Sequence, residues 1–200
     1  FKKEKLKMKK ALWLDSINQE KIINFERLKG GVSSEVYKIR TKKNYYCVKR
    51  SLKKLLVKKK WIANTNRIKF EFLWLQHCKK ILSRNIPKVY EYNSKEKYIL
   101  MEYLNENKFK TLKDLYFREE INFNTIKLIS NHLFKIHSKS SNVKTRNIFK
   151  RNNKNFFDLR LDPYFNEVGK VYPKYKKYIN SINQDYYKFS STLVHGDFSP

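Results

Sequence analysis

The sequence predicts an α+β fold: an N-terminal lobe with a five-stranded antiparallel sheet and one main helix, then a partial, mostly helical C-terminal lobe. Three observations predict it. Short segments rich in β-branched and aromatic residues alternate with turn residues over 23–50 and again over 86–104. Between them, residues 61–82 carry apolar side chains at spacings of three and four, as in a helix. From residue 111 onward helical spacing predominates.

The composition indicates a folded protein without a membrane segment. Of its 200 residues, 40% are hydrophobic and 16% aromatic, enough to bury a core although 32% are charged. Its apolar runs are a few residues long, far below the roughly 20 that a membrane helix needs. The basic N-terminus lacks the apolar core and the cleavage site of a signal peptide. We therefore expect a cytoplasmic protein with no membrane partner.

The two cysteines, Cys47 and Cys78, each lie among apolar residues. This setting favours buried free thiols in a reducing cytosol over a disulfide between them. Neither cysteine belongs to a Cys/His cluster with the spacing of a zinc site. We therefore expect no metal ligand among the cysteines.

The chain is strongly basic, with 46 Lys and Arg against 18 Asp and Glu, a net charge of +28. Such a charge is typical of proteins that bind nucleic acid. However, lysine greatly outnumbers arginine along the whole chain, and arginine is the usual reader of bases and phosphates. A solvated lysine surface with affinity for anionic substrates is the favoured interpretation. A non-catalytic nucleotide- or nucleic-acid-binding basic module stays open as the alternative.

In order along the chain, residues 1–20 are expected to form a leading helix, with Leu6, Leu12 and Trp13 near one face. Strand alternation and turn residues then predict the sheet. Its five strands are expected at 23–29, 35–41, 45–50, 86–93 and 97–104. The main helix over 61–82 is expected to be capped by Asn64 or Thr65.

Helices follow a short polar linker at residues 104–110. Their apolar spacing and capping residues predict helices from Thr111, over 124–140 and over 172–189. Between the last two helices, residues 157–165 are expected to form an irregular connection. The segment 192–195 is expected to be a short strand that leads into a turn at Gly196.

Four features carry chemistry, although each alone has a plain structural interpretation. The Gly30–Ser34 turn has the flexible backbone and hydroxyls that can approach a phosphate, but it also suits an ordinary hairpin. Lys49 ends a strand, and Glu71 sits in an apolar helix face where a carboxylate needs a partner, for which Lys49 is the candidate. Asp197 follows a glycine on a sharp turn, where it can accept a proton from a substrate hydroxyl.

In this order, the four features resemble the aminoglycoside phosphotransferase/choline kinase superfamily, whose fold is protein-kinase-like and whose catalytic loop reads H-G-D-x-x-x-x-N. The segment 47–75, "LRLDPYF" and "LVHGDFSP" are most similar to methylthioribose kinase-like bacterial phosphotransferases. The resemblance covers nearly all of residues 20–200. It implies a nucleotide-binding lobe at 1–103, a hinge at 104–110 and a partial helical lobe at 111–200 that ends in the catalytic loop.

The resemblance also implies a role for each matching residue. ATP, with Mg²⁺, would be the phosphate donor, and Asp197 would be the catalytic base that serves a sugar, aminoglycoside or amino-alcohol hydroxyl. His195 would be a buried structural residue of the catalytic loop. The nucleotide-binding residues would be Gly30, Gly31, Ser33 and Ser34 in the covering loop, Lys49 and Glu71 at the phosphates, Met101 behind the adenine, and the backbone of Glu102 and Leu104 at its edge.

The chain departs from the family pattern at its end. The Asn of the motif would fall two positions past Pro200, and the later Asp that holds Mg²⁺ in the family is also missing. The magnesium ligands are therefore expected beyond residue 200, and none within the chain. We expect a fragment that is itself inactive, through either a natural truncation or an incomplete reading frame. The acceptor and the oligomeric state stay open.

Overall fold

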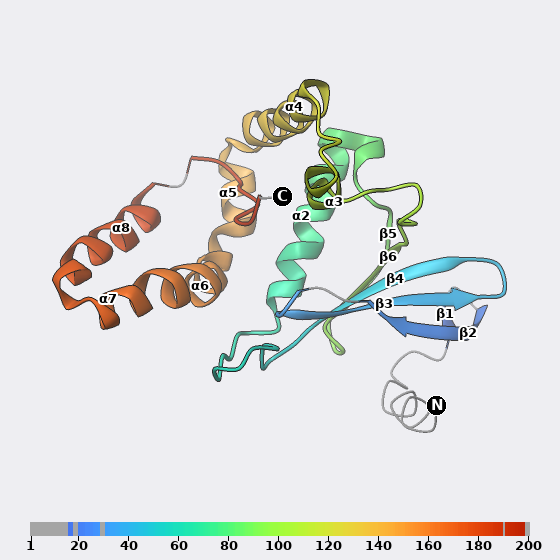
Figure 1. Cartoon of the computed structure of the whole chain (residues 1–200), viewed down its shortest axis with the longest axis horizontal. Helices are drawn as coiled ribbons and strands as arrows, with labels where there is room; N and C mark the ends of the chain where they lie inside the picture. Colours follow the sequence, from blue (N-terminus) through green and yellow to red (C-terminus); the bar gives the residue numbers. More distant parts are fainter. Residues whose placement is uncertain (1–15, 18–19, 29–30, 190, 199–200) are drawn as a thin grey trace. The chain divides into compact units, whose positions relative to one another are not determined.

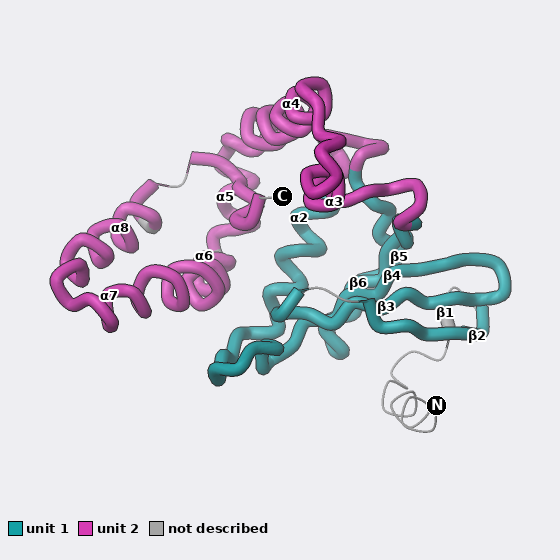
Figure 2. Tube along the Cα trace, viewed as in Figure 1, with its two compact units in different colours: residues 1–76, 86–105 teal, residues 77–85, 106–200 magenta. Residues whose placement is uncertain are grey.

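The computed structural model describes residues 16–17, 20–28, 31–189 and 191–198, which form an α+β protein (Figure 1). They divide into two compact units (Figure 2). Unit 1 holds the described residues up to Gln76 together with Ile86–Asn105, and unit 2 holds His77–Asn85 together with those from Glu106 onward. The main helix α2 (Arg67–Leu82) therefore contributes to both units.

Unit 1 is built on an antiparallel sheet of six strands in the order β1-β2-β3-β4-β6-β5. All five predicted strands are present, and β1 adds a two-residue pairing at one edge. The strands are β1 (Ser16–Ile17), β2 (Glu20–Arg27), β3 (Ser34–Thr41), β4 (Tyr45–Ser51), β5 (Val89–Asn93) and β6 (Tyr98–Glu102).

The predicted leading helix over 1–20 is wrong in its described part. Ser16 pairs with Lys21 and Ile17 with Glu20, so this segment is a strand edge. Ile17, Ile22 and Ile23 favour an extended backbone because branching at Cβ restricts their side chains in a helix. Residues 1–15 and 18–19, with the rest of that prediction, lie outside the described residues.

The two faces of the sheet carry different side chains, because successive residues of β4 alternate between them. Tyr46 and Val48 are buried on one face, in a core cluster with Ile39, Tyr98 and Leu100. The opposite face of β4 carries Cys47, Lys49 and Ser51. This second face positions the charged residues of the candidate site.

Helix α2 packs against the sheet within unit 1 through Phe72, whose ring stacks on that of Tyr92 at 5.0 Å. It begins at Arg67 rather than at residue 61, so the prediction of its start is wrong. The reason is a backbone pairing of the preceding segment with residues 53–55, in which the Ala63 amide donates to the Lys53 carbonyl at 3.0 Å. Asn64 bonds the Asn66 amide at 2.9 Å and so orders the turn before the helix.

Unit 2 is helical over most of its described length. Its elements after α2 are η1 (Ser83–Asn85), α3 (Leu112–Phe117), α4 (Phe123–Ser140), α5 (Val143–Phe149), η2 (Lys150–Asn152), α6 (Asn153–Phe156), η3 (Phe157–Asn166), α7 (Glu167–Val171), η4 (Pro173–Tyr175) and α8 (Lys176–Lys188). No helix in the described part of the chain is long and apolar enough to cross a membrane.

Side-chain caps begin three of these helices. Thr111, the predicted cap of α3, accepts a hydrogen bond from the Asp114 amide at 3.0 Å. Asn122 and Asn142 cap α4 and α5 in the same way, each at 2.9 Å. Each cap satisfies an amide that the first helical turn leaves without a partner.

The predicted irregular connection at 157–165 is wrong, because these residues form the π-helix η3. Pro163 lies within it and lacks the amide hydrogen that a regular α-helix requires. The wider π-helical turn keeps the chain helical around this residue. Within this element Leu161 is buried, whereas the Arg160 side chain reaches the Gly196 carbonyl.

Candidate functional site

Lys49 and Glu71 form the ion pair that the sequence predicts. The Lys49 Nζ donates to the Glu71 Oε1 at 2.7 Å, from β4 to the first half of α2. Both side chains are about one-third exposed, at 31% and 34%. The pair is therefore held by the sheet and the helix while an ammonium edge stays accessible to a ligand.

The strand register places other predicted residues on the Lys49 face. Lys49 lies opposite Val36 on one side and Ile99 on the other, and the next row brings Met101 opposite Cys47. Residues directly opposite in an antiparallel sheet share a face. Lys49 and Met101 are therefore diagonal neighbours. Burial raises the pKa of the Cys47 thiol on this face to about 11.

The predicted glycine turn is described from Gly31, because Gly30 lies outside the described residues. Gly31 has a φ of 60°, in the left-handed region that favours glycine. The carbonyls of Val32 and Ser33 accept bonds from the Leu56 amide at 2.8 Å and the Leu52 amide at 3.0 Å. Among described residues, no group accepts from the amides of Gly31, Val32 or Ser33, so these donors remain for a ligand.

Ser34 differs from Ser33 in its place. It is the first residue of β3, lies opposite Ser51 and is 7% exposed. Ser33 precedes the strand and is half-buried in the turn. The two predicted serines are therefore adjacent in sequence but only Ser33 belongs to the turn itself.

Arg67 is a residue of this region that site prediction from the sequence missed. Its guanidinium donates to the carbonyls of Ser33, Leu52 and Asn64, the last two at 2.8 Å, and so fixes the glycine turn to the start of α2. Burial lowers its pKa from the ordinary value. A cation in the first turn of a helix opposes the helix dipole, and that misfit was the signal in the sequence.

The predicted hinge follows the end of β6 at Glu102. The Glu102 amide donates to the Lys88 carbonyl at 2.8 Å, and its carboxylate accepts from the Lys88 amide at 3.0 Å. Leu104 lies beyond the strand and is 41% exposed. Within the described chain its amide has no acceptor, so Leu104 offers a free donor at this edge.

In unit 2, Asp197 lies on the predicted glycine turn, and Gly196 has a φ of 78°. The strand predicted at 192–195 is wrong, since residues 191–198 contain no strand. Side-chain bonds hold this segment instead: Thr192 donates to the His137 carbonyl at 2.6 Å, and Ser141 to the Ser191 carbonyl at 3.1 Å. The expectation of a buried His195 is also wrong, because without a strand no layer encloses it and it is exposed.

Arg160 holds the Asp197 turn and was not predicted as a site residue. Its Nη2 lies 2.7 Å from the Asp197 Oδ2, and its Nε donates to the Gly196 carbonyl at 3.2 Å. The Asp197 side chain is 64% exposed, so solvent screens this pair. Only the tertiary structure shows the pairing, because 36 residues separate the two partners of the Gly196 bond.

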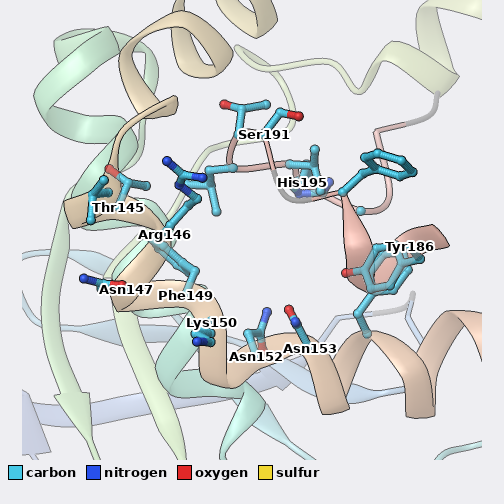
Figure 3. Close-up of a pocket in the computed structure, with 17 residues that line it drawn as sticks. Thr145, Arg146, Asn147, Phe149, Lys150, Asn152, Asn153, Tyr186, Ser191 and His195 are labelled. Atoms are coloured by element: carbon cyan, nitrogen blue, oxygen red, sulfur yellow. The ribbon is translucent and has the colours of Figure 1, made fainter. Parts of the chain in front are cut away.

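A pocket of about 820 Å³ adjoins this turn within unit 2 (Figure 3). Its wall runs from α5 through α6 to α8 and the segment that ends at Gly196. The rings of Phe156 and Tyr186, which both line it, stack at 4.4 Å with an interplanar angle of 9°. Figure 3 shows His195 across the pocket from Asn152 and Asn153.

Replacing Gly196 by alanine is expected to destabilise the protein by about 1–2 kcal/mol. A Cβ at this left-handed position would also meet the Phe156 ring at 3.1 Å. Denaturant unfolding measures the change. The matched control is Gly169→Ala in α7, where a Cβ meets the Ile179 Cδ1 at 3.3 Å and the Lys176 Cα at 3.6 Å, without a left-handed φ, and gains up to about 1 kcal/mol of helix propensity. Equal stability losses in the two variants would contradict the strained turn.

Comparison with protein-family models and with curated proteins found no match to this chain. Within the described ranges, no three His, Cys, Asp or Glu side chains gather in a way that could hold a metal ion. We therefore infer the function of the chain from the geometry of these residues.

Proposed function

We propose that the chain belongs to an ATP-dependent small-molecule kinase of protein-kinase-like fold. Unit 1 binds the nucleotide, and unit 2 supplies the catalytic base for transfer of the γ-phosphate to a hydroxyl of a sugar, aminoglycoside or amino alcohol. The Lys49–Glu71 ion pair carries the proposal, because it joins a strand lysine to a helix carboxylate beside a glycine turn. Protein-kinase sites position phosphates with the same pair of groups.

In this proposal Lys49 binds the α- and β-phosphates of ATP, and Glu71 orients its ammonium. The turn amides at Gly31–Ser33, from which no described group accepts, donate to phosphate oxygens, a role suited to successive backbone N–H groups. The adenine lies against Met101. The Glu102 amide is already used by Lys88, so the adenine edge bonds to the Glu102 carbonyl and the Leu104 amide.

Asp197 accepts the proton of the acceptor hydroxyl as the hydroxyl oxygen attacks the γ-phosphorus, and the bond from the γ-phosphorus to the bridging oxygen of the β-phosphate breaks to release ADP. Arg160 holds the carboxylate and the adjacent Gly196 carbonyl, so it is a positioning residue for this base. Mg²⁺ would accompany ATP in such a kinase, but the described side chains form no cluster that fits it.

Titration calorimetry of ATP binding at two salt concentrations tests the proposed function. A nucleotide held by one lysine and backbone amides is expected to bind one-to-one and to lose less than about tenfold in affinity between 50 and 200 mM salt. A surface that binds nucleic acid through six to ten phosphates would lose about 10³–10⁵-fold over the same range. No saturable ATP binding, together with tight and salt-sensitive RNA binding, would favour the basic module that the +28 charge otherwise suggests.

A further inference from the structure

The pocket of unit 2 has a one-sided charge. Of the residues that line it, Arg146 and Lys150 are cationic, and none is an aspartate or glutamate. Arg146 lies in α5 and Lys150 begins η2, one helical turn later, so both belong to the same part of the wall. Neither has an ion-pair partner among the residues described. Their charge is therefore not neutralised locally.

The rest of the wall suits a small polyol. Asn147, Asn152 and Asn153 contribute amides, and Thr145 and Ser191 contribute hydroxyls, which can both donate and accept hydrogen bonds. The stacked rings of Phe156 and Tyr186 add a flat apolar surface on which the face of a sugar ring can lie. Pockets that combine apolar rings with a few polar groups are typical of sites for small organic ligands.

We propose that this pocket holds the phosphate acceptor and selects a hydroxylated, sugar-sized molecule that carries a negative charge, rather than a polycationic aminoglycoside or an amino alcohol. That the ligand is the phosphate acceptor rests on the proposed kinase function, whereas its selection by charge depends only on the pocket. A cationic ligand would lie near Arg146 and Lys150 with no lining carboxylate to offset the repulsion. The Asp197 carboxylate, just past the Gly196 end of the wall, is paired with Arg160 at 2.7 Å. An anion gains from both side chains. The Gly196 end of the wall places such a ligand next to the residue proposed as base.

Three hexoses of one skeleton and different charge test the inference: glucuronate, glucose and glucosamine. Binding to the full chain is measured by ligand-observed NMR at constant ionic strength. We expect affinity to fall in the order glucuronate, glucose, glucosamine, with at least about tenfold between the first and the last. Glucosamine binding as tightly as glucuronate would overturn the inference.

Two double variants distinguish attraction by the pocket cations from attraction by the overall charge of +28. Arg146→Gln with Lys150→Gln is expected to reduce the glucuronate preference to less than about threefold. The control, Lys127→Gln with Lys135→Gln, removes the same charge from exposed positions of α4 and is expected to retain it. Equal losses in the two double variants would show a diffuse field and overturn the assignment to the pocket.

ATP binding and the order of the hexose affinities are measured independently. If the charge order holds and ATP does not bind, the pocket selects anionic sugars and the kinase proposal fails. If ATP binds and the three hexoses bind alike, the kinase proposal stands and the inference about its acceptor fails. Because the hexose order is measured on the unmodified chain, the test does not depend on the variants folding.

Discussion

Lys49→Met is expected to weaken ATP binding by about 10- to 100-fold, as calorimetry would measure it. A charge-assisted hydrogen bond to an anion is worth about 1.5–3 kcal/mol, which corresponds to that range of affinity. Lys49 is the cation that the sheet and the Glu71 carboxylate fix in place at 2.7 Å. Glu71→Gln keeps the ammonium but loosens its orientation, so a smaller loss is expected from it.

The matched control is Arg50→Met, one residue farther along β4 and on the opposite face of the sheet. Arg50 also pairs with a carboxylate, Glu96 at 3.4 Å, and the two pairs have similar exposure, 34% and 32% against 31% and 34%. The control therefore removes the same charge from the same strand. If Arg50→Met weakens ATP binding as much as Lys49→Met, the nucleotide does not occupy the Lys49 face.

Leu100→Ala is expected to reduce the free energy of unfolding by about 2–5 kcal/mol, the usual cost of removing a buried leucine side chain and leaving a cavity. Leu100 is 2% exposed and belongs to the core cluster between β3, β4 and β6. Since the same strands carry Lys49 and Met101, this loss is also expected to reduce the folded fraction that can bind ATP. Denaturant unfolding followed by circular dichroism measures it.

The control for this prediction is Leu56→Ala, in the same unit. Leu56 is 50% exposed, and its backbone bond to Val32 does not involve the side chain. Its replacement is expected to cost less than about 1 kcal/mol. A Leu100→Ala loss no larger than that of Leu56→Ala would mean that the cluster around Leu100 does not hold the sheet together.

Local patterns in the sequence predicted the parts of this protein that depend on local physics. Alternation along 45–50 predicted that Lys49 shares a face of β4 with Cys47 and that Val48 lies on the other face, because side chains of a strand alternate between its faces. The Lys49–Glu71 pair was predicted because a carboxylate in an apolar helix face needs a cation. Thr111 was predicted as a cap because its hydroxyl can satisfy a free helical amide.

The features that prediction missed depend on contacts between distant segments. Arg160 and the Asp197 turn meet only in the folded chain, and nothing near either residue in sequence indicates the pair. The segment 192–195 has the composition of a strand, yet it has no neighbouring strand to pair with in the described chain. A strand needs such a partner for its backbone hydrogen bonds. Arg67 could have been found, because its cation is misplaced at a helix start.

Covalent labelling with a reactive ATP derivative is the first test of whether ATP binds beside Lys49. An acyl-phosphate derivative of ATP transfers its acyl group to a lysine amine that lies beside the bound phosphates, and mass spectrometry identifies the modified lysine. We expect Lys49 to be the main labelled residue in this lysine-rich chain, and we expect excess ATP to prevent its labelling. Labelling spread over exposed lysines such as Lys127, with no protection by ATP, would contradict a nucleotide site on the Lys49 face.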